Sequence, residues 1–263
     1  MTSNTNQPLL LRRDAEGIAT LTMNRPESRN SLSQEMSIEL QAAFDSTDTD
    51  DSVSVVILTA KGPAFCAGHD MKQIRANPDE AYYRTSFEQS SRLMKTIIGL
   101  SKPVIAQVQG TATAAGCQIV ATCDLAVAAR SASFATPGVN IGLFCSTPLV
   151  ALTRNVGRKH AMEMLLTGES IDAETALAYG LVNRVVDEKA LEEEAFGLAR
   201  QIARHSSICV EIGKRAFYDQ IGCPLDKAYE VAAEAMTRNM MAHDAEEGFD
   251  AFLEKRVPRW EGR

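Results

Sequence analysis

The chain has 263 residues, of which 45% are hydrophobic and 23% are charged, with a formal net charge of −7. A chain of this length and composition buries enough apolar surface for a stable core, which excludes disorder as its main state. The acidic balance argues against a broad nucleic-acid interface, because proteins that bind the phosphate backbone present a basic face.

Apolar runs and turn signals predict strands and helices in alternation over the first half of the chain. We expect strands at 18–23, 53–60, 103–108, 125–129 and 133–135, helices at about 33–45, 79–100 and 113–122, and a short helix that begins at Asp70. Ser33 and Asp70 are placed to cap two of these helices, and Gln73 completes a capping-box pattern with Asp70. The segments 61–68 and 110–115, rich in small residues, are expected to be loops.

The second half is predicted to be mostly helical, with helices near 148–156, 158–166, 172–179, 187–205, 207–220, 225–242 and 245–255. Strand–loop–helix units followed by helices predict an α/β fold. We expect an α/β core over residues 1–200 and a helical oligomerisation region over 201–263. The uncharged segment 131–153 contains many turn-forming residues, so we expect it to line a pocket and predict no membrane span.

The cysteines and histidines indicate neither a disulfide framework nor a metal site. The six cysteines form no CxxC pair, and the four histidines have no metal-ligand spacing. The first seven residues are polar and lack the apolar region of a secretory signal. Reduced thiols in a cytoplasmic protein are therefore the expectation.

Two segments share a design in which a strand ends in small residues and turns into a helix. They are residues 65–70, Phe-Cys-Ala-Gly-His-Asp, and residues 110–118, Gly-Thr-Ala-Thr-Ala-Ala-Gly-Cys-Gln. Small residues allow a ligand to approach the backbone, and a helix N-terminus presents unpaired amides. Two such turns facing each other would form an oxyanion hole. Taken alone, each segment is better explained as a tight turn that packs a helix on a sheet.

Four motifs in order resemble the crotonase family, also called the enoyl-CoA hydratase/isomerase family. They lie at 21–32, 65–71, 110–124 and 252–256. The motifs at 68–70, 113–118 and 134–140 are similar to one branch of that family. The resemblance implies a crotonase-like spiral of ββα units with a C-terminal helical trimerisation region.

The resemblance also implies a function, an enzyme of the lyase class acting on an acyl-CoA or enoyl-CoA thioester in fatty-acid metabolism. The thioester carbonyl would accept hydrogen bonds from the backbone amides of His69 and Ala115. Coenzyme A would enter as part of the substrate, so no separate cofactor and no metal are expected. A homotrimer or a dimer of trimers is implied as the assembly.

The sequence departs from the family where hydratases carry two catalytic glutamates. These positions correspond to Gln118 and Gly138, and neither residue exchanges protons near neutral pH. An isomerase, a thioester hydrolase and a non-catalytic acyl-CoA-binding protein therefore stay open beside an enoyl-CoA hydratase. Spacing places Gln118 on the same helix face as Ala115, where it would bind substrate or water. Hydration activity created by Gln118→Glu together with Gly138→Glu would support the non-catalytic acyl-CoA-binding protein.

Further residues are candidates for contacting the thioester, each with a structural alternative. His69 could also contribute its imidazole, and Cys145 could act as a nucleophile or proton donor. Arg29, Lys72 and Lys255 could bind the phosphates of coenzyme A, or be solvated surface charges. The remaining candidates for substrate contact are Asp70, Met71, Gly138, Asn140 and Ser146.

Overall fold

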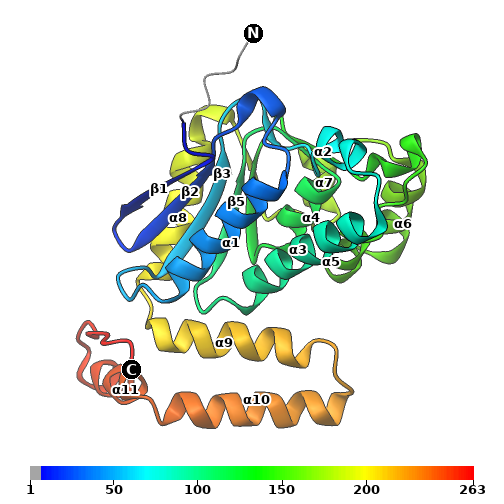
Figure 1. The fold of residues 1–263 in the computed structure, drawn as a ribbon. Helices are drawn as coiled ribbons and strands as arrows, with labels where there is room; N and C mark the ends of the chain where they lie inside the picture. Colours follow the sequence, from blue (N-terminus) through cyan, green and yellow to red (C-terminus); the bar gives the residue numbers. More distant parts are fainter. Residues whose placement is uncertain (1–6) are drawn as a thin grey trace.

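The computed structural model describes residues 7–263 and contains two β-sheets surrounded by helices (Figure 1). The larger sheet has the strand order β1-β2-β3-β5-β7-β10, in which β1 and β2 are antiparallel and the other pairs are parallel. Its strands are β1 (Leu10–Ala15), β2 (Ile18–Met23), β3 (Val55–Ala60), β5 (Val104–Val108), β7 (Leu125–Ala129) and β10 (Arg184–Val186).

The smaller sheet has the order β4-β6-β8-β9. Two of its strands, β4 and β6, belong to the two strand-to-helix segments of the sequence analysis. Its strands are β4 (Ala64–Cys66), β6 (Thr111–Thr113), β8 (Ser133–Ala135) and β9 (Ile171–Asp172). The prediction of plain loops at 61–68 and 110–115 is therefore wrong in part, because each contains a three-residue strand. Three times, a strand of the larger sheet is followed by a strand of the smaller sheet. These successions are β3 to β4, β5 to β6 and β7 to β8.

The predicted α/β class and all the predicted strands and helices are present, with ends shifted by a few residues. The helices are α1 (Gln34–Asp48), α2 (Met71–Ala76), α3 (Glu80–Gly99), α4 (Ala115–Thr122), α5 (Pro148–Asn155), α6 (Arg158–Thr167), α7 (Ala173–Ala178), α8 (Leu191–Ala203), α9 (Ser207–Gln220), α10 (Leu225–Met240) and α11 (His243–Glu254), with short 3-10 turns at Pro26–Ser28, Pro137–Ile141 and Glu188–Ala190. Ser33 and Asp70 cap α1 and α2 as predicted. The capping box is not formed, because the Gln73 side chain accepts from the Gln34 amide and contacts Glu35 instead.

The larger sheet is buried on both faces, which explains the uninterrupted apolar run of β3. Val55 and Ile57 pack in one cluster with Leu191 and Ala195 of α8. Val56 and Leu58 belong to the main cluster on the opposite face, which contains residues of α1, α3 and α4. Side chains of a strand alternate between faces, so both halves of the run have to be apolar.

The C-terminal helices α9, α10 and α11 stand apart from the sheets, with α10 antiparallel to α9 and α11 beside the C-terminus (Figure 1). A buried ion pair holds α9 to the core. The Lys214 ammonium lies 2.8 Å from an Asp124 carboxylate oxygen, and it also donates to the carbonyl oxygens of Ile97 and Lys102. Tyr218 donates to the other oxygen of Asp124. The division at residue 200 stays a prediction, since α8 packs on the sheet and ends at Ala203.

Within residues 7–263, no helix is long and apolar enough to cross a bilayer.

Candidate functional site

The first turn follows β4 and is held in place by the backbone of the segment before α1. The Leu32 amide donates to the Gly68 carbonyl at 2.8 Å, and the Asp70 amide donates to the Leu32 carbonyl at 3.1 Å. Asp70 then starts α2, because one of its carboxylate oxygens accepts from the amides of Lys72 and Gln73. Its other oxygen lies 3.4 Å from the Arg25 guanidinium. Asp70 is therefore a capping residue rather than a free acid at the site.

The second turn follows β6 and adopts an unusual backbone conformation. Ala114 has φ +50° and ψ −116°, a region that residues with a Cβ rarely occupy. The conformation is held on both sides, because the Ala114 amide donates to the Ala135 carbonyl and its own carbonyl accepts from the Gln118 amide. Helix α4 begins at the next residue, so the Ala115 amide is one of the unpaired donors of a helix N-terminus.

The two turns touch each other at glycine positions. A methyl group on Gly68, which has φ +89°, would lie 2.9 Å from the Ala114 Cβ and 3.3 Å from the Ala115 nitrogen. A methyl group on Gly116 would lie 2.0 Å from the Cys66 carbonyl oxygen. These contacts leave no room for side chains, so the glycines set how closely the turns approach.

The amides of His69 and Ala115 donate to no acceptor within the part of the chain that the structure describes. They belong to the two turns that Gly68 brings into contact. An arrangement of two free backbone amides on adjoining turns can stabilise an oxygen that gains negative charge. The role of these two amides as donors to a ligand stays a prediction.

Gln118 lies one turn into α4 and is 4% exposed. Its side-chain oxygen is buried and accepts no hydrogen bond from the residues described. A buried acceptor without a partner costs about 1–3 kcal/mol, which makes it a candidate for binding a polar ligand or water. The predicted placement of Gln118 beside Ala115 is consistent with this position on the first turns of α4.

The His69 imidazole lies edge-on against the Phe87 ring of α3, with ring centroids 5.4 Å apart. Its Nε2 atom is buried and has no partner among the described residues. Burial lowers the pKa of His69 below its ordinary value, because the charged form is poorly solvated there. The side chain is therefore a neutral polar group that packs against Phe87.

This lowered pKa of His69 makes the folding free energy depend on pH. Between the lowered pKa and about 6.5 the unfolded chain binds more protons than the folded chain, so stability falls as the pH drops through that interval. Urea unfolding at pH 7.5 and at pH 5.5 measures the free energy of unfolding at each pH. The decrease in this free energy from pH 7.5 to pH 5.5 is expected to be smaller in His69→Gln than in the unsubstituted protein. Equal losses in both proteins would contradict the burial of a neutral imidazole.

Gly138 and Cys145 pack against each other on the segment after β8. A methyl group on Gly138 would lie 2.0 Å from the Leu143 carbonyl oxygen and 2.8 Å from the Cys145 sulfur. A side chain at Gly138 would therefore displace the 143–145 segment, which fills that space. Burial raises the pKa of the Cys145 thiol, so the proposed role as a nucleophile has no support from its protonation state.

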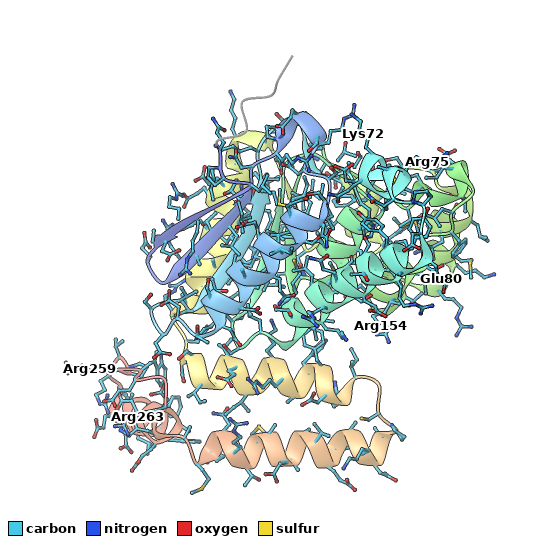
Figure 2. All side chains as sticks on the ribbon, viewed as in Figure 1. Lys72, Arg75, Glu80, Arg154, Arg259 and Arg263 are labelled. Carbon is cyan, nitrogen blue, oxygen red and sulfur yellow. The ribbon has the colours of Figure 1, made fainter. Side chains whose placement is uncertain are left out.

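The other predicted contact residues lie on the surface or serve local structure. Met71, Lys72, Arg29 and Ser146 are exposed, and Figure 2 shows Lys72 at the outer side of the molecule. Asn140 is exposed and packs beside Gly168 at the end of α6.

Lys255 ends α11 in the left-handed conformation, with φ +57°. Helix α11 lies in the C-terminal helical group, away from the two turns in Figure 1. The chain by itself therefore does not bring Lys255 to the predicted site.

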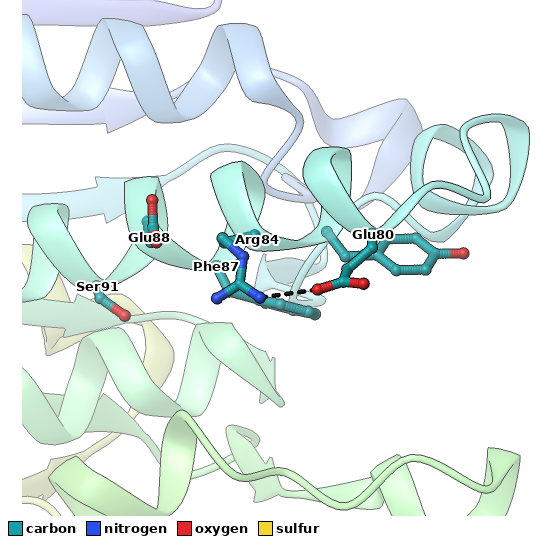
Figure 3. A pocket seen from close by; sticks show the side chains of 6 residues that line it. Glu80, Arg84, Phe87, Glu88 and Ser91 are labelled. Carbon is teal, nitrogen blue, oxygen red and sulfur yellow. Dashed lines mark hydrogen bonds and ion pairs between the residues drawn. The ribbon is translucent and has the colours of Figure 1, made fainter.

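A surface hollow of about 360 Å³ lies on one side of α3 (Figure 3). It is lined by Glu80, Tyr83, Arg84, Phe87, Glu88 and Ser91, with an ion pair between Arg84 and Glu80. Phe87 connects this hollow with the site, since the same ring contacts His69. No residue of either turn lines the hollow, so the hollow is separate from the two amides.

No group of three or more His, Cys, Asp or Glu side chains in the described part of the chain is arranged to hold a metal ion.

Ser90 is a buried polar residue that was not predicted from the sequence. It is 1% exposed, lies on α3, and its hydroxyl has no partner within residues 7–263. A signal was available, because Ser90 shares the apolar face of α3 with Leu93, Met94 and Ile97. A serine on a fully buried helix face needs either a hydrogen-bond partner or a function.

The amino-acid sequence is similar to those of known proteins over most of its length. Residues 13–263 match the family model described as enoyl-CoA hydratase/isomerase. The chain is 46% identical to human "Enoyl-CoA hydratase domain-containing protein 3, mitochondrial", covering 94% of this chain and 82% of that protein. It is 33% identical to the 2,3-dehydroadipyl-CoA hydratase of Escherichia coli, covering 94% and 96%.

Solved structures agree with these sequence matches. An enoyl-CoA hydratase from Mycobacterium smegmatis has a TM-score of 0.94 at 52% identity, covering 97% of this chain and 99% of that one. The human domain-containing protein 3 has a TM-score of 0.93 at 45% identity, covering 96% and 100%. The branch whose motifs were seen in the sequence is the one to which this human protein belongs.

These relatives correct the expected localisation. Proteins from rat, human and mouse at 44–46% identity are named as mitochondrial, so the prediction of a cytoplasmic protein is contradicted. Unpaired cysteines indicate a reducing environment, but they do not identify the compartment.

Proposed function

The chain belongs to the enoyl-CoA hydratase/isomerase family, and we propose that it binds an acyl-CoA thioester whose carbonyl oxygen accepts hydrogen bonds from the His69 and Ala115 amides. Its fold is the crotonase fold, as the neighbouring solved structures have it. The observation that supports this proposal most is the contact of the two turns at Gly68, which places two free amides on adjoining segments.

In the proposed chemistry the carbonyl oxygen gains negative charge as the thioester becomes enolate-like. Fixed amide dipoles stabilise that charge more than they stabilise the neutral carbonyl, and so favour the transition state. One such donor is typically worth about 10²–10³ in kcat. Coenzyme A would enter as part of the thioester, and we propose no separate cofactor.

Hydration of an enoyl-CoA in fatty-acid metabolism is the reaction we favour for this site. A second candidate is binding of an acyl-CoA without proton transfer. Gln118 supports this second candidate, because a carboxamide does not exchange protons near neutral pH. Gly138 supports it as well, since the packed 143–145 segment leaves no space for an acid there.

We also propose that the protein assembles through its C-terminal helices as a trimer or a dimer of trimers. Helices α10 and α11 expose large apolar side chains, among them Met236 at 65%, Phe252 at 81% and Leu253 at 75%. Apolar surface of this kind is stabilised by burial between subunits. Such an assembly could bring Lys255 of one subunit to another, whereas Arg29 and Lys72 could reach the phosphates of coenzyme A within one chain.

Calorimetry with butyryl-CoA and a turnover assay with crotonyl-CoA test the proposal. Ala115→Pro deletes the amide donor at the first helical position, where proline is well tolerated. We expect thioester binding to weaken about tenfold, and kcat to fall by about 10²–10³ if the protein is active. Glu80→Pro, at the exposed first position of α3, is the matched control and should change neither.

The outcomes separate the candidates. Uptake of butyryl-CoA together with turnover of crotonyl-CoA supports the hydratase. Uptake without turnover supports the binding protein. Absence of binding to both thioesters would overturn the proposal.

A further inference from the structure

Helix α11 is turned the opposite way from an ordinary surface helix, which buries its apolar face. The side chains of Phe249, Phe252 and Leu253 share one face of α11 and are 54%, 81% and 75% exposed. The side chains that α11 turns inward include two acids, Asp244 and Glu247, which are only 1% and 16% exposed. Burial of apolar surface does not explain this orientation, so polar contacts have to hold the helix.

The segment 255–263 supplies these contacts by running back along α11. The amides of Glu261 and Gly262 donate to the two carboxylate oxygens of Asp244, at 2.8 and 3.0 Å. The Asp244 amide donates in turn to the Arg263 carbonyl at 3.0 Å. Hydrogen bonds to a carboxylate are stronger than those between neutral groups. The far end of the segment is therefore joined firmly to the first turn of α11.

Glu247 holds the part of the segment that follows α11 directly. Its two carboxylate oxygens accept from the Arg256 guanidinium at 2.6 and 2.8 Å, and one of them also accepts from the Arg259 amide at 2.7 Å. Glu247 lies three residues after Asp244, so both acids share the inward side of the helix. Figure 2 labels Arg259 and Arg263 on this segment. We call residues 255–263 the clasp.

Trp260 joins the clasp to the end of α8. Its indole N–H donates to the Arg204 carbonyl at 2.9 Å. A methyl group on Gly248 would lie 3.3 Å from the Trp260 ring, so the ring packs directly on the backbone of α11. The clasp therefore fixes α11 against the rest of the chain. Trp260 is also the only tryptophan in the sequence, so its fluorescence reports on the clasp alone.

We propose that the clasp is a local conformational switch for assembly; this rests on the proposed assembly through the C-terminal helices. When it is closed, it keeps Phe249, Phe252 and Leu253 turned outward, where a second copy of this chain can cover them. When it opens, α11 is released while the sheets and the other helices stay folded. The released helix then turns these side chains against its own chain, because apolar surface is more stable out of water.

The contacts of the clasp explain why it would open before the core. Hydrogen bonds and ion pairs at the periphery hold it, and peripheral segments with little buried apolar surface open at a lower free energy than core elements. Asp244 is the critical group, because its carboxylate accepts both amides at the far end. Loss of this one carboxylate is therefore sufficient to open the clasp.

The first experiment follows the urea unfolding of the whole chain by Trp260 fluorescence and by far-UV circular dichroism, at one protein concentration. We expect the fluorescence transition at a lower urea concentration than the circular dichroism transition, because the clasp opens first. Coincident transitions would overturn the local opening.

The second experiment uses Asp244→Ala, with Asp250→Ala on the same helix as the matched control. Asp250 is exposed and makes no ion pair within the described residues. We expect the open population to rise at least about tenfold in Asp244→Ala, seen as a red shift of the Trp260 emission without urea. The far-UV signal should stay unchanged, and Asp250→Ala should change neither. An unshifted emission in Asp244→Ala, or a lost far-UV signal, would overturn the switch.

Gly262→Ala opens the clasp without changing α11. Gly262 has φ +76°, and a methyl group there would lie 2.7 Å from the Ser207 hydroxyl oxygen. A side chain is strained in this conformation, so the same red shift of the emission is expected. Gly222→Ala is the matched control, because a methyl group on Gly222 meets nothing within 4 Å. Equal emission from both glycine variants would contradict the closed clasp.

Light scattering on the same variants tests the consequence for assembly. We expect Asp244→Ala and Gly262→Ala to lose the assembled mass, while Asp250→Ala and Gly222→Ala keep that of the unsubstituted protein. An assembly retained in a variant with the red-shifted emission would overturn the switch but leave the proposed assembly intact. The mass of a single chain in the unsubstituted protein would overturn the proposed assembly and this inference with it.

Discussion

Gly116→Ala is expected to destabilise the protein by about 3 kcal/mol. The added methyl group would lie 2.0 Å from the Cys66 carbonyl oxygen and 2.7 Å from its carbon, both of which are backbone atoms. Relief requires α4 to move away from β4, and this shift would separate the two amide-bearing turns. Chemical denaturation measures the loss of stability, and calorimetry with butyryl-CoA measures the accompanying loss of binding.

The matched control for Gly116→Ala is Gly197→Ala, in the middle of α8. A methyl group on Gly197 meets nothing within 4 Å, so the better helix propensity of alanine should stabilise the protein by about 0.5–1 kcal/mol. If glycine-to-alanine lowers the stability at Gly116 and raises it at Gly197, close packing is the cause of the loss at Gly116. A gain of stability in Gly116→Ala would mean that α4 and β4 are not in contact.

Lys214→Met is expected to destabilise the protein by about 3–5 kcal/mol, because it leaves a buried carboxylate without its counter-ion. The side chains of Lys214 and Asp124 are only 6% and 15% exposed. The same substitution removes donors to the carbonyls of Ile97 and Lys102, which join α9 to the core. Denaturation measures the stability, and light scattering reports whether assembly through the C-terminal helices is lost as well.

Two further variants test the assignment of the Lys214 effect. In the double variant with Asp124→Asn no charge is left uncompensated, so its loss of stability should be smaller than the sum of the single losses. Lys227→Met, which breaks an exposed pair with Glu230, should change stability by less than about 0.5 kcal/mol. Additive losses in the double variant would contradict a direct coupling of Lys214 with Asp124.

The sequence predicted most of the helices and the central strands, because these elements carry a local signal. The apolar run of β3 and the caps Ser33 and Asp70 are examples in which composition alone determines the local structure. Strand β1 was missed because four of its six residues are exposed, so it has little apolar pattern. The short strands β4 and β6 were missed because pairing between distant segments, and not propensity, makes them strands.

The contact of the two turns could be predicted from their small residues, and the turns adjoin at Gly68 as expected. The roles of His69 and Ala115 as donors come from the family resemblance and stay a prediction. Ser90 could not be predicted, because the burial of its hydroxyl depends on how α3 packs against the rest of the fold. The blocked space at Gly138 depends on how the chain returns at Leu143 and Cys145, which no local pattern specifies.

The close packing at Gly138 has a consequence for attempts to redesign this protein. The Leu143 amide also donates to the Gly138 carbonyl at 2.9 Å, so the two segments are joined by a hydrogen bond as well as by contact. A carboxylate therefore cannot be introduced at position 138 by a single substitution. Engineering it requires a rebuilt 138–145 loop, and libraries that vary loop length are the suitable starting point.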